Sequence, residues 1–276
     1  MADAKLPLRL GNRKFLKARS ASLRNAGRLQ LSDQAIRAAA EANRAGNLLT
    51  LLLKQAVSEL RFRLLARASI RTQLNDKACD AYSRMPAELF AGINARQMWS
   101  NWRTIPRNLS GRLPNDGVKM IDLCCGTGDS TQVLAYYAPA GSEILGLEYN
   151  PSFVACARKR PFVNRHRRRV NVAFAAQSVL ETFRDAAGAP VRERTVDVVN
   201  SCGAVACHFD LNATAVLARE IARVLKNDGF AMIDTGPGET RSRELIGVFE
   251  AAGFVPVHRV RSCFADRYTH VCFQKY

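Results

Sequence analysis

The second half of the chain alternates short apolar runs with longer stretches of helical periodicity. Five apolar runs of about five or six residues read as buried strands: 118–123, 143–147, 170–174, 196–201 and 230–234. Helical stretches lie between them, at about 129–137, 151–160, 178–187 and 211–225. This alternation predicts an α/β fold with a doubly wound parallel sheet and right-handed crossovers. A further helix at 241–252 precedes two closely spaced runs, 254–261 and 269–274, which we expect to form an antiparallel pair at one sheet edge.

The first half has a different texture. Residues 1–30 hold eight basic side chains and one acid, which predicts a flexible basic arm over 1–31. Ser32 can cap a helix, and Gly46 divides the stretch 32–75 into two helices. The second of these contains apolar residues at spacings of three and four: Leu49, Leu53, Val57, Leu60 and Leu64. A third helical region spans about 77–110, so we expect residues 32–117 to form a helical cap or lid ahead of an α/β domain at 118–276.

Net charge, hydropathy and cysteine content exclude some classes of protein. The net charge is +17, of which residues 1–117 contribute +13. No apolar run approaches the roughly 20 residues of a membrane-spanning helix, and no secretory signal is evident. The Arg-rich N-terminus leaves an organellar presequence open. The eight cysteines form no Cys-x-x-Cys pair, which favours reduced, buried thiols over metal ligands in a cytoplasmic protein.

The first strand of the α/β half runs directly into a glycine turn and a helix. Gly126 and Gly128 let the backbone approach a ligand, and the helix N-terminus offers unpaired N–H donors. About 20 residues later the next strand ends at Glu148, where a carboxylate can bind a ribose diol. The turn lacks the third glycine of a dinucleotide fingerprint and is flanked by Asp122 and Asp129. Because carboxylates suit a cationic ligand and repel pyrophosphate, these residues favour S-adenosylmethionine over NAD or FAD.

Several blocks resemble one known class of enzyme. Asp-Leu-Cys-Cys-Gly-Thr-Gly-Asp, residues 122–129, is similar to the corresponding block of the ubiquinone/menaquinone C-methyltransferase family. Residues 196–209 resemble its fourth-strand block, residues 225–230 resemble the "LKPGG" turn before strand five, and residues 81–85 and 99–103 resemble its lid helix. The resemblance implies a class I S-adenosylmethionine-dependent methyltransferase with a Rossmann-like, seven-stranded sheet whose last strand is antiparallel.

The resemblance also implies roles for individual residues. Asp122, Gly126 and Gly128 would shape the methionine pocket, and Asp122 or Asp129 would take the amino group. Glu148 would bind the ribose hydroxyls, Tyr149 or Asn150 would flank the adenine, and Gln177 would accept from the adenine amine. Cys124 replaces the first glycine of the usual motif. The cofactor-binding set is completed by residues at the turn, at the end of the fourth strand and in the lid: Thr127, Asn200, Ser201 and Tyr82.

The acceptor is less constrained by the sequence. His208 follows the fourth strand and is the candidate general base, although a histidine there can equally pack the strand end. Asn200 and Ser201 could also position an acceptor. Trp99 and Trp102 either roof the pocket or anchor the core. We expect a small organic acceptor and no metal.

Two other readings stay open. The segment 158–169 carries seven basic residues and no acid, so, with the N-terminal arm, it could direct the enzyme to RNA or to an anionic membrane surface. Alternatively, the chain is a non-catalytic scaffold that retains the fold.

Overall fold

A computed structural model describes residues 28–66, 85–236, 238–263 and 268–276. Seven strands form one sheet in the order β3-β2-β1-β4-β5-β7-β6. Their bounds are β1 Lys119–Leu123, β2 Glu143–Glu148, β3 Asn171–Ala176, β4 Val196–Ser201, β5 Leu225–Asp234, β6 Phe254–Val260 and β7 His270–Lys275. β7 pairs antiparallel with both β5 and β6, and the pairs among β1 to β5 are parallel. The predicted doubly wound sheet with an antiparallel last strand is confirmed.

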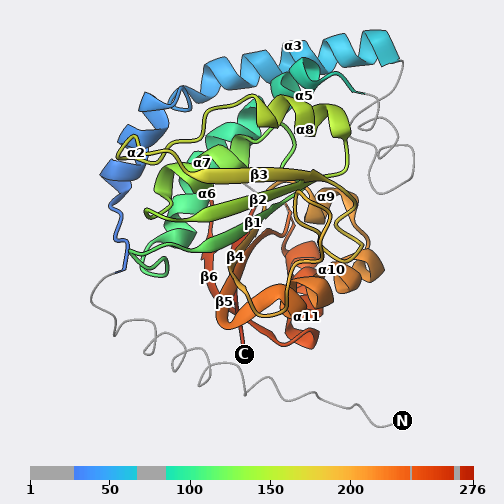
Figure 1. Cartoon of the computed structure of the whole chain (residues 1–276). Coiled ribbons are helices and arrows are strands. Elements are labelled where there is room, and N and C mark those ends of the chain that lie inside the picture. Colours follow the sequence, from blue (N-terminus) through green and yellow to red (C-terminus); the bar gives the residue numbers. More distant parts are fainter. Residues whose placement is uncertain (1–27, 67–84, 237, 264–267) are drawn as a thin grey trace, which may run out of the picture.

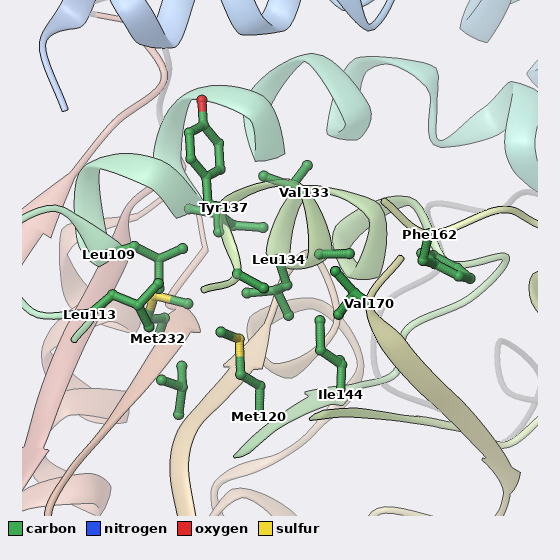
Figure 2. Close-up of a cluster of buried hydrophobic side chains, with 14 of the residues drawn as sticks. Leu109, Leu113, Met120, Val133, Leu134, Tyr137, Ile144, Phe162, Val170 and Met232 are labelled. Carbon is green, nitrogen blue, oxygen red and sulfur yellow. The ribbon is translucent and has the colours of Figure 1, made fainter. Parts of the chain in front are cut away.

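Helices cover both faces of the sheet (Figure 1). One face packs against α6 (Ala95–Leu109), α7 (Asp129–Tyr137) and α8 (Pro151–Arg158), and the other against α10 (Leu211–Val224) and α11 (Glu239–Ala251). In β1, Met120 belongs to the first core and Ile121 to the second, as the alternation of side chains along a strand requires. Figure 2 shows the first core, where Leu134 and Val133 of α7 lie over Met120 and Ile144.

The prediction of a helix at 178–187 is wrong. Turns and an isolated bridge between Arg184 and Pro190 connect β3 to β4. Asp185 Oδ1 accepts hydrogen bonds from the backbone N–H groups of Ala187 and Ala189, and Gly188 has a φ of +86°. Side chain to backbone bonds of this kind compete with helix formation, and the apolar residues of the stretch do not reveal them.

Strand β5 also starts earlier than expected. The residues that resemble a turn, 225–230, lie within β5, where Leu225 pairs with Val196. The register shifts between Val196 and Val198, so the irregularity is accommodated inside the ladder as a bulge.

The N-terminal half is helical where it is described. It contains α2 (Asp33–Ala42), α3 (Leu48–Ala66) and α5 (Ala87–Ile93), with Gly46 between the first two as predicted. The third helical region is broken at Asn94, which separates α5 from α6. Tyr82 and residues 1–27 of the arm predicted over 1–31 lie outside the described residues. The end of that predicted arm is packed on the fold, because Leu29 is 5% exposed and its backbone N–H donates to the Leu113 carbonyl at 2.9 Å. No helix in the described ranges is long and apolar enough to cross a membrane.

Helix α6 is built into the α/β core. Trp102 is 1% exposed and packs edge-on against Tyr136 of α7, with ring centroids 5.2 Å apart. Trp99 is buried beside Leu51 of α3, and the Arg103 guanidinium lies 4.0 Å from the centre of its ring. Both tryptophans therefore anchor the core, which is the second of the two roles considered for them.

The start of α2 provides a small test of the N-terminal half. Ser32 Oγ accepts a hydrogen bond from the Ala35 backbone N–H at 3.1 Å. We expect Ser32→Ala to lower the free energy of unfolding by about 1 kcal/mol, because an N–H of the first turn loses its acceptor. Urea denaturation measures this. Gln34→Ala is the control, since Gln34 is exposed on the same helix; equal stability of the two variants would contradict the capping role.

Candidate cofactor site

A tight turn at residues 124–128 links β1 to α7 at the carboxyl edge of the sheet. Cys124, Gly126 and Gly128 have φ values of +51°, +53° and +86°. Glycine adopts this region freely, whereas it costs a residue with a Cβ about 1–2 kcal/mol. Cys124 is therefore held in a strained conformation by the surrounding structure, a feature that clusters at functional sites.

The side chain of Asp122 stabilises this turn through hydrogen bonds. This side chain is fully buried. It accepts hydrogen bonds from Ser130 Oγ at 2.7 Å, Thr131 Oγ1 at 2.6 Å and Asn200 Nδ2 at 2.7 Å. Burial raises the pKa of Asp122 to about 6, against the lowering effect of these three donors. Asp122 thus ties β1 to α7 and β4, and it presents no surface to a ligand.

Glu148 reaches the turn from the end of β2. Its Oε2 accepts from the Gly126 N–H and its Oε1 from the Asn150 N–H, both at 2.9 Å. Burial raises the pKa of Glu148, although the backbone donors oppose the rise. The structure thereby brings together the two features on which the sequence prediction rested, the glycine turn and the carboxylate about 20 residues further on.

Asp129 is paired with a residue that the sequence alone did not single out, Arg160. Arg160 Nη1 lies 2.7 Å from Asp129 Oδ1 and donates to the Thr127 carbonyl at 2.9 Å, and its other terminal nitrogen contacts Gln132. Arg160 belongs to the basic segment 158–169, and nothing in its local sequence distinguishes it from its neighbours. It neutralises the carboxylate beside the turn and braces the turn's backbone.

Two buried hydroxyls in this region have no hydrogen-bond partner within the described structure, Thr127 Oγ1 in the turn and Ser201 Oγ at the end of β4. Buried polar atoms are normally satisfied, so such a pair at one sheet edge is typical of a place where a ligand completes the bonding. Asn200, next to Ser201, is fully buried and bonded to Asp122. The residues present therefore fit a polar ligand lying on the turn.

The three residues expected around the adenine differ from one another in exposure and in hydrogen bonding. Tyr149 is 64% exposed. Asn150 caps α8, and its Oδ1 accepts from the Ser152 N–H at 2.9 Å. Gln177 uses both ends of its amide on the backbone of Arg184. Asn150 and Gln177 thus have structural bonds, and their adenine contacts stay predictions.

His208 ends the short helix α9 (Val205–His208) after β4 and is half-buried. Burial lowers the pKa of His208 below its usual value, which favours the neutral imidazole. A second histidine, His270 on β7, is fully buried beside Asn108 and Cys202, and burial lowers its pKa to about 4. The Nε2 atom of His270 lies 3.6 Å from the Sγ atom of Cys202, which is two residues after Asn200 in the sequence.

Side chains of the N-terminal half lie against the site. The ring of Phe90 on α5 packs so closely on Gly126 that a Cβ there would collide with it, and the same ring lies 4.2 Å from that of Phe153 on α8. A Cβ on Gly203, just after β4, would lie 3.1 Å from the side chain of Gln97 on α6. Helices α5 and α6 therefore border the glycine turn and the end of β4.

Among the described residues, no group of three or more histidine, cysteine, aspartate or glutamate side chains could hold a metal ion, and the seven described cysteines are free thiols.

Known proteins share this arrangement. Residues 114–250, about half of the chain, match the family model of a methyltransferase domain. Together with the fold and the glycine turn, this match assigns the chain to the class I S-adenosylmethionine-dependent methyltransferases. S-Adenosylmethionine is the cofactor of that class.

Individual relatives are more distant. A 2-phytyl-1,4-naphtoquinone methyltransferase of Thermosynechococcus vestitus is 30% identical over 89 residues, which are 32% of this chain and 36% of that protein. The chain thus matches about a third of the length of this curated relative.

Two solved structures share the fold. One is a chain of a complex described as that between the Haloferax volcanii Trm112 methyltransferase activator and a possible methyltransferase (TM-score 0.52, 19% identity, 71% of this chain and 96% of the other). The second is described as a possible exported protein from Bordetella parapertussis (TM-score 0.51, 18% identity, 83% and 87%).

Proposed function

We propose that the chain transfers a methyl group from S-adenosylmethionine to a small organic acceptor. The observation that carries this proposal is the convergence of Glu148, the strained turn at 124–128 and the unpartnered hydroxyls of Thr127 and Ser201 at one edge of the sheet. The relative that acts on a naphthoquinone derivative favours a small-molecule acceptor over a macromolecule.

The cofactor would be held by residues at the ends of two strands and in the turn. Glu148 would bind the ribose hydroxyls, the turn would carry the methionine portion, and Thr127 and Ser201 would complete the polar contacts. When bound, S-adenosylmethionine supplies a methyl group on a positively charged sulfur, and transfer needs donor and acceptor to be held in line. The role of this chain is therefore chiefly to position the two molecules.

Of the two aspartates proposed for the amino group, Asp129 is the better placed. Asp122 is fully buried and already accepts three hydrogen bonds. Asp129 keeps 20% of its side chain exposed despite its pairing with Arg160. Asp122 would then act indirectly, by fixing the turn and Asn200.

Helices α5 and α6 would form the lid over the acceptor. Phe90 lies on Gly126 and Gln97 on Gly203, so these two side chains border the space where donor and acceptor must meet. An apolar ring over the turn also excludes water from the site, which protects a reactive donor. Phe90 would have to shift from Gly126 when the turn carries a ligand.

His208 would accept a proton from an acceptor whose attacking atom carries one. A neutral imidazole is required for this role, and burial favours that form by lowering the pKa of His208. We expect His208→Gln to lower kcat about 100-fold, the low end of general-base effects, while binding of S-adenosylhomocysteine stays unchanged. Steady-state kinetics and calorimetry measure the two quantities. His166→Gln, on the exposed connection before β3, is the control, and a normal kcat for His208→Gln would assign His208 to packing.

The proposed function is tested by incubating the purified chain with donor labelled on the methyl group and a metabolite extract. Mass analysis of the labelled product then identifies the acceptor. We expect label in one small molecule, with quinones the first class to examine. Label in RNA or in membrane lipid would overturn the small-molecule assignment, and no labelling at all would support the non-catalytic scaffold.

A further inference from the structure

Helix α3 exposes a row of large apolar side chains. Six residues, between 39% and 77% exposed, form this leucine face: Leu49, Leu52, Leu53, Val57, Leu60 and Leu64. All but Leu52 lie within about 80° around the helix axis, at 3.6 residues per turn. Soluble proteins rarely leave such a contiguous apolar surface in water unless it binds something.

The opposite side of α3 is firmly packed. Leu51 is buried beside Ala95 and Trp99 of α6, and Phe62 is buried beside Ile93 of α5. Gln55 accepts a hydrogen bond from the Arg96 N–H, and Gly92 leaves just enough room for Ser58. The leucine face is therefore held outward by a helix that already has its own core contacts. Figure 1 shows α3 as the outermost element on that side of the molecule.

The charges beside the leucine face are basic. Lys54 and Arg61 flank it on one side and Arg63 projects within it, and all three are exposed. Glu59 is the single acid in α3, and it accepts a hydrogen bond from Gln55 at 2.8 Å. An apolar face bordered by Lys and Arg is the pattern of helices that lie in the interface of an anionic bilayer.

We propose that α3 docks the protein on the surface of an anionic lipid bilayer, with the leucine face inserted among the lipid chains and Lys54, Arg61 and Arg63 at the headgroups. The occupant is a membrane rather than a second copy of the chain. Two α3 helices packed face to face would bring three cations from each copy together with one acid from each, Glu59, which already accepts a hydrogen bond from Gln55. A net charge of +17 on each copy also opposes self-association.

Docking through α3 would also bring the cofactor site close to the membrane surface. Helix α5 contacts α3 through Gly92 and the glycine turn through Phe90, so one short helix separates the membrane surface from the turn. The docking does not depend on methyl transfer, because the face and the charges that carry it lie outside the cofactor site.

Sedimentation of the full chain with vesicles tests the proposal without any cofactor. Wild-type protein should bind vesicles of phosphatidylcholine with phosphatidylserine at least tenfold more tightly than vesicles of phosphatidylcholine alone, and 0.5 M salt should weaken the binding. The double variant Leu53→Gln, Leu60→Gln should bind at least tenfold more weakly than wild type, because two inserted side chains lose their burial. Gln keeps helix propensity, and the sites are exposed, so the fold should persist, as circular dichroism can verify.

The matched control is Leu180→Gln with Val216→Gln, two exposed apolar residues away from α3, which should bind like wild type. Absence of wild-type binding, or equal binding by the α3 variant, would overturn the proposal. A dimer in sedimentation equilibrium that the α3 variant loses would overturn it too, in favour of a second copy as the occupant.

Discussion

Glu148→Ala is expected to weaken binding of S-adenosylhomocysteine about 1,000-fold. A carboxylate that accepts two hydroxyl donors of a ribose makes two charge-assisted hydrogen bonds, each contributing about 1.5–3 kcal/mol. In the proposed complex Glu148 would make both bonds from the end of β2, where the N–H groups of Gly126 and Asn150 donate to it and hold its orientation. Titration calorimetry of wild type and variant measures the difference.

The control for this change is Glu181→Ala. Glu181 is exposed in the connection after β3, so its removal should leave the affinity intact. Because Glu148 also braces the turn, thermal unfolding of Glu148→Ala must show a folded protein. Glu148→Gln keeps one acceptor oxygen, so its affinity should lie between those of wild type and Glu148→Ala. Unchanged affinity in a folded Glu148→Ala variant would contradict the ribose role.

Asp122→Ala is expected to lower the free energy of unfolding by about 3 kcal/mol at pH 4, where the folded carboxyl is protonated and its burial carries no charge penalty. The change removes the common acceptor of Ser130, Thr131 and Asn200 inside the core, and each buried donor left without a partner costs about 1–3 kcal/mol. The hydroxyls can recover part of this cost by turning to other acceptors. Urea denaturation measures the loss, and a loss below about 1 kcal/mol would contradict the anchoring role.

The pH dependence of Asp122 has a definite sign. Burial raises the pKa of Asp122 in the folded state to about 6, from the ordinary aspartate value of 3.8. The folded state therefore binds the proton more tightly, and stability is lost as pH rises from about 4 through 6, by up to about 3 kcal/mol. Asp122→Asn cannot ionise. We expect its stability relative to wild type to increase across this pH window; a constant difference would show that the carboxylate is not perturbed.

The sheet was predictable because its information is local. Each buried strand is a short apolar run, and the antiparallel pair at its end follows from two runs without a helix between them. The connection at 178–187 was not, because its apolar residues suggested a helix, whereas Asp185 accepts hydrogen bonds from backbone N–H groups two and four residues further on and Gly188 has a positive φ. The repeat of Leu49, Leu53 and Leu60 correctly predicted a helix, but periodicity does not say which side of a helix finds a partner.

The candidate site was predictable in outline only. The glycine turn and Glu148 carry the motif in their own sequence, so their meeting could be foreseen. The pairing of Arg160 with Asp129 and the packing of Phe90 on Gly126 join segments more than 30 residues apart by chain folding. The burial of Asp122 could not be foreseen either. Asp122 was expected to contact the ligand, but its side chain is buried and accepts three hydrogen bonds that stabilise the turn.

We propose that the turn at 124–128 and Glu148 bind S-adenosylmethionine together, and a crystal structure of the chain with S-adenosylhomocysteine would show whether they do. We expect the ligand over Gly126 and Gly128, its ribose hydroxyls within hydrogen-bond distance of Glu148, and the Phe90 ring displaced from Gly126. A ligand bound elsewhere, or Glu148 without a ribose contact in an occupied site, would refute this binding mode.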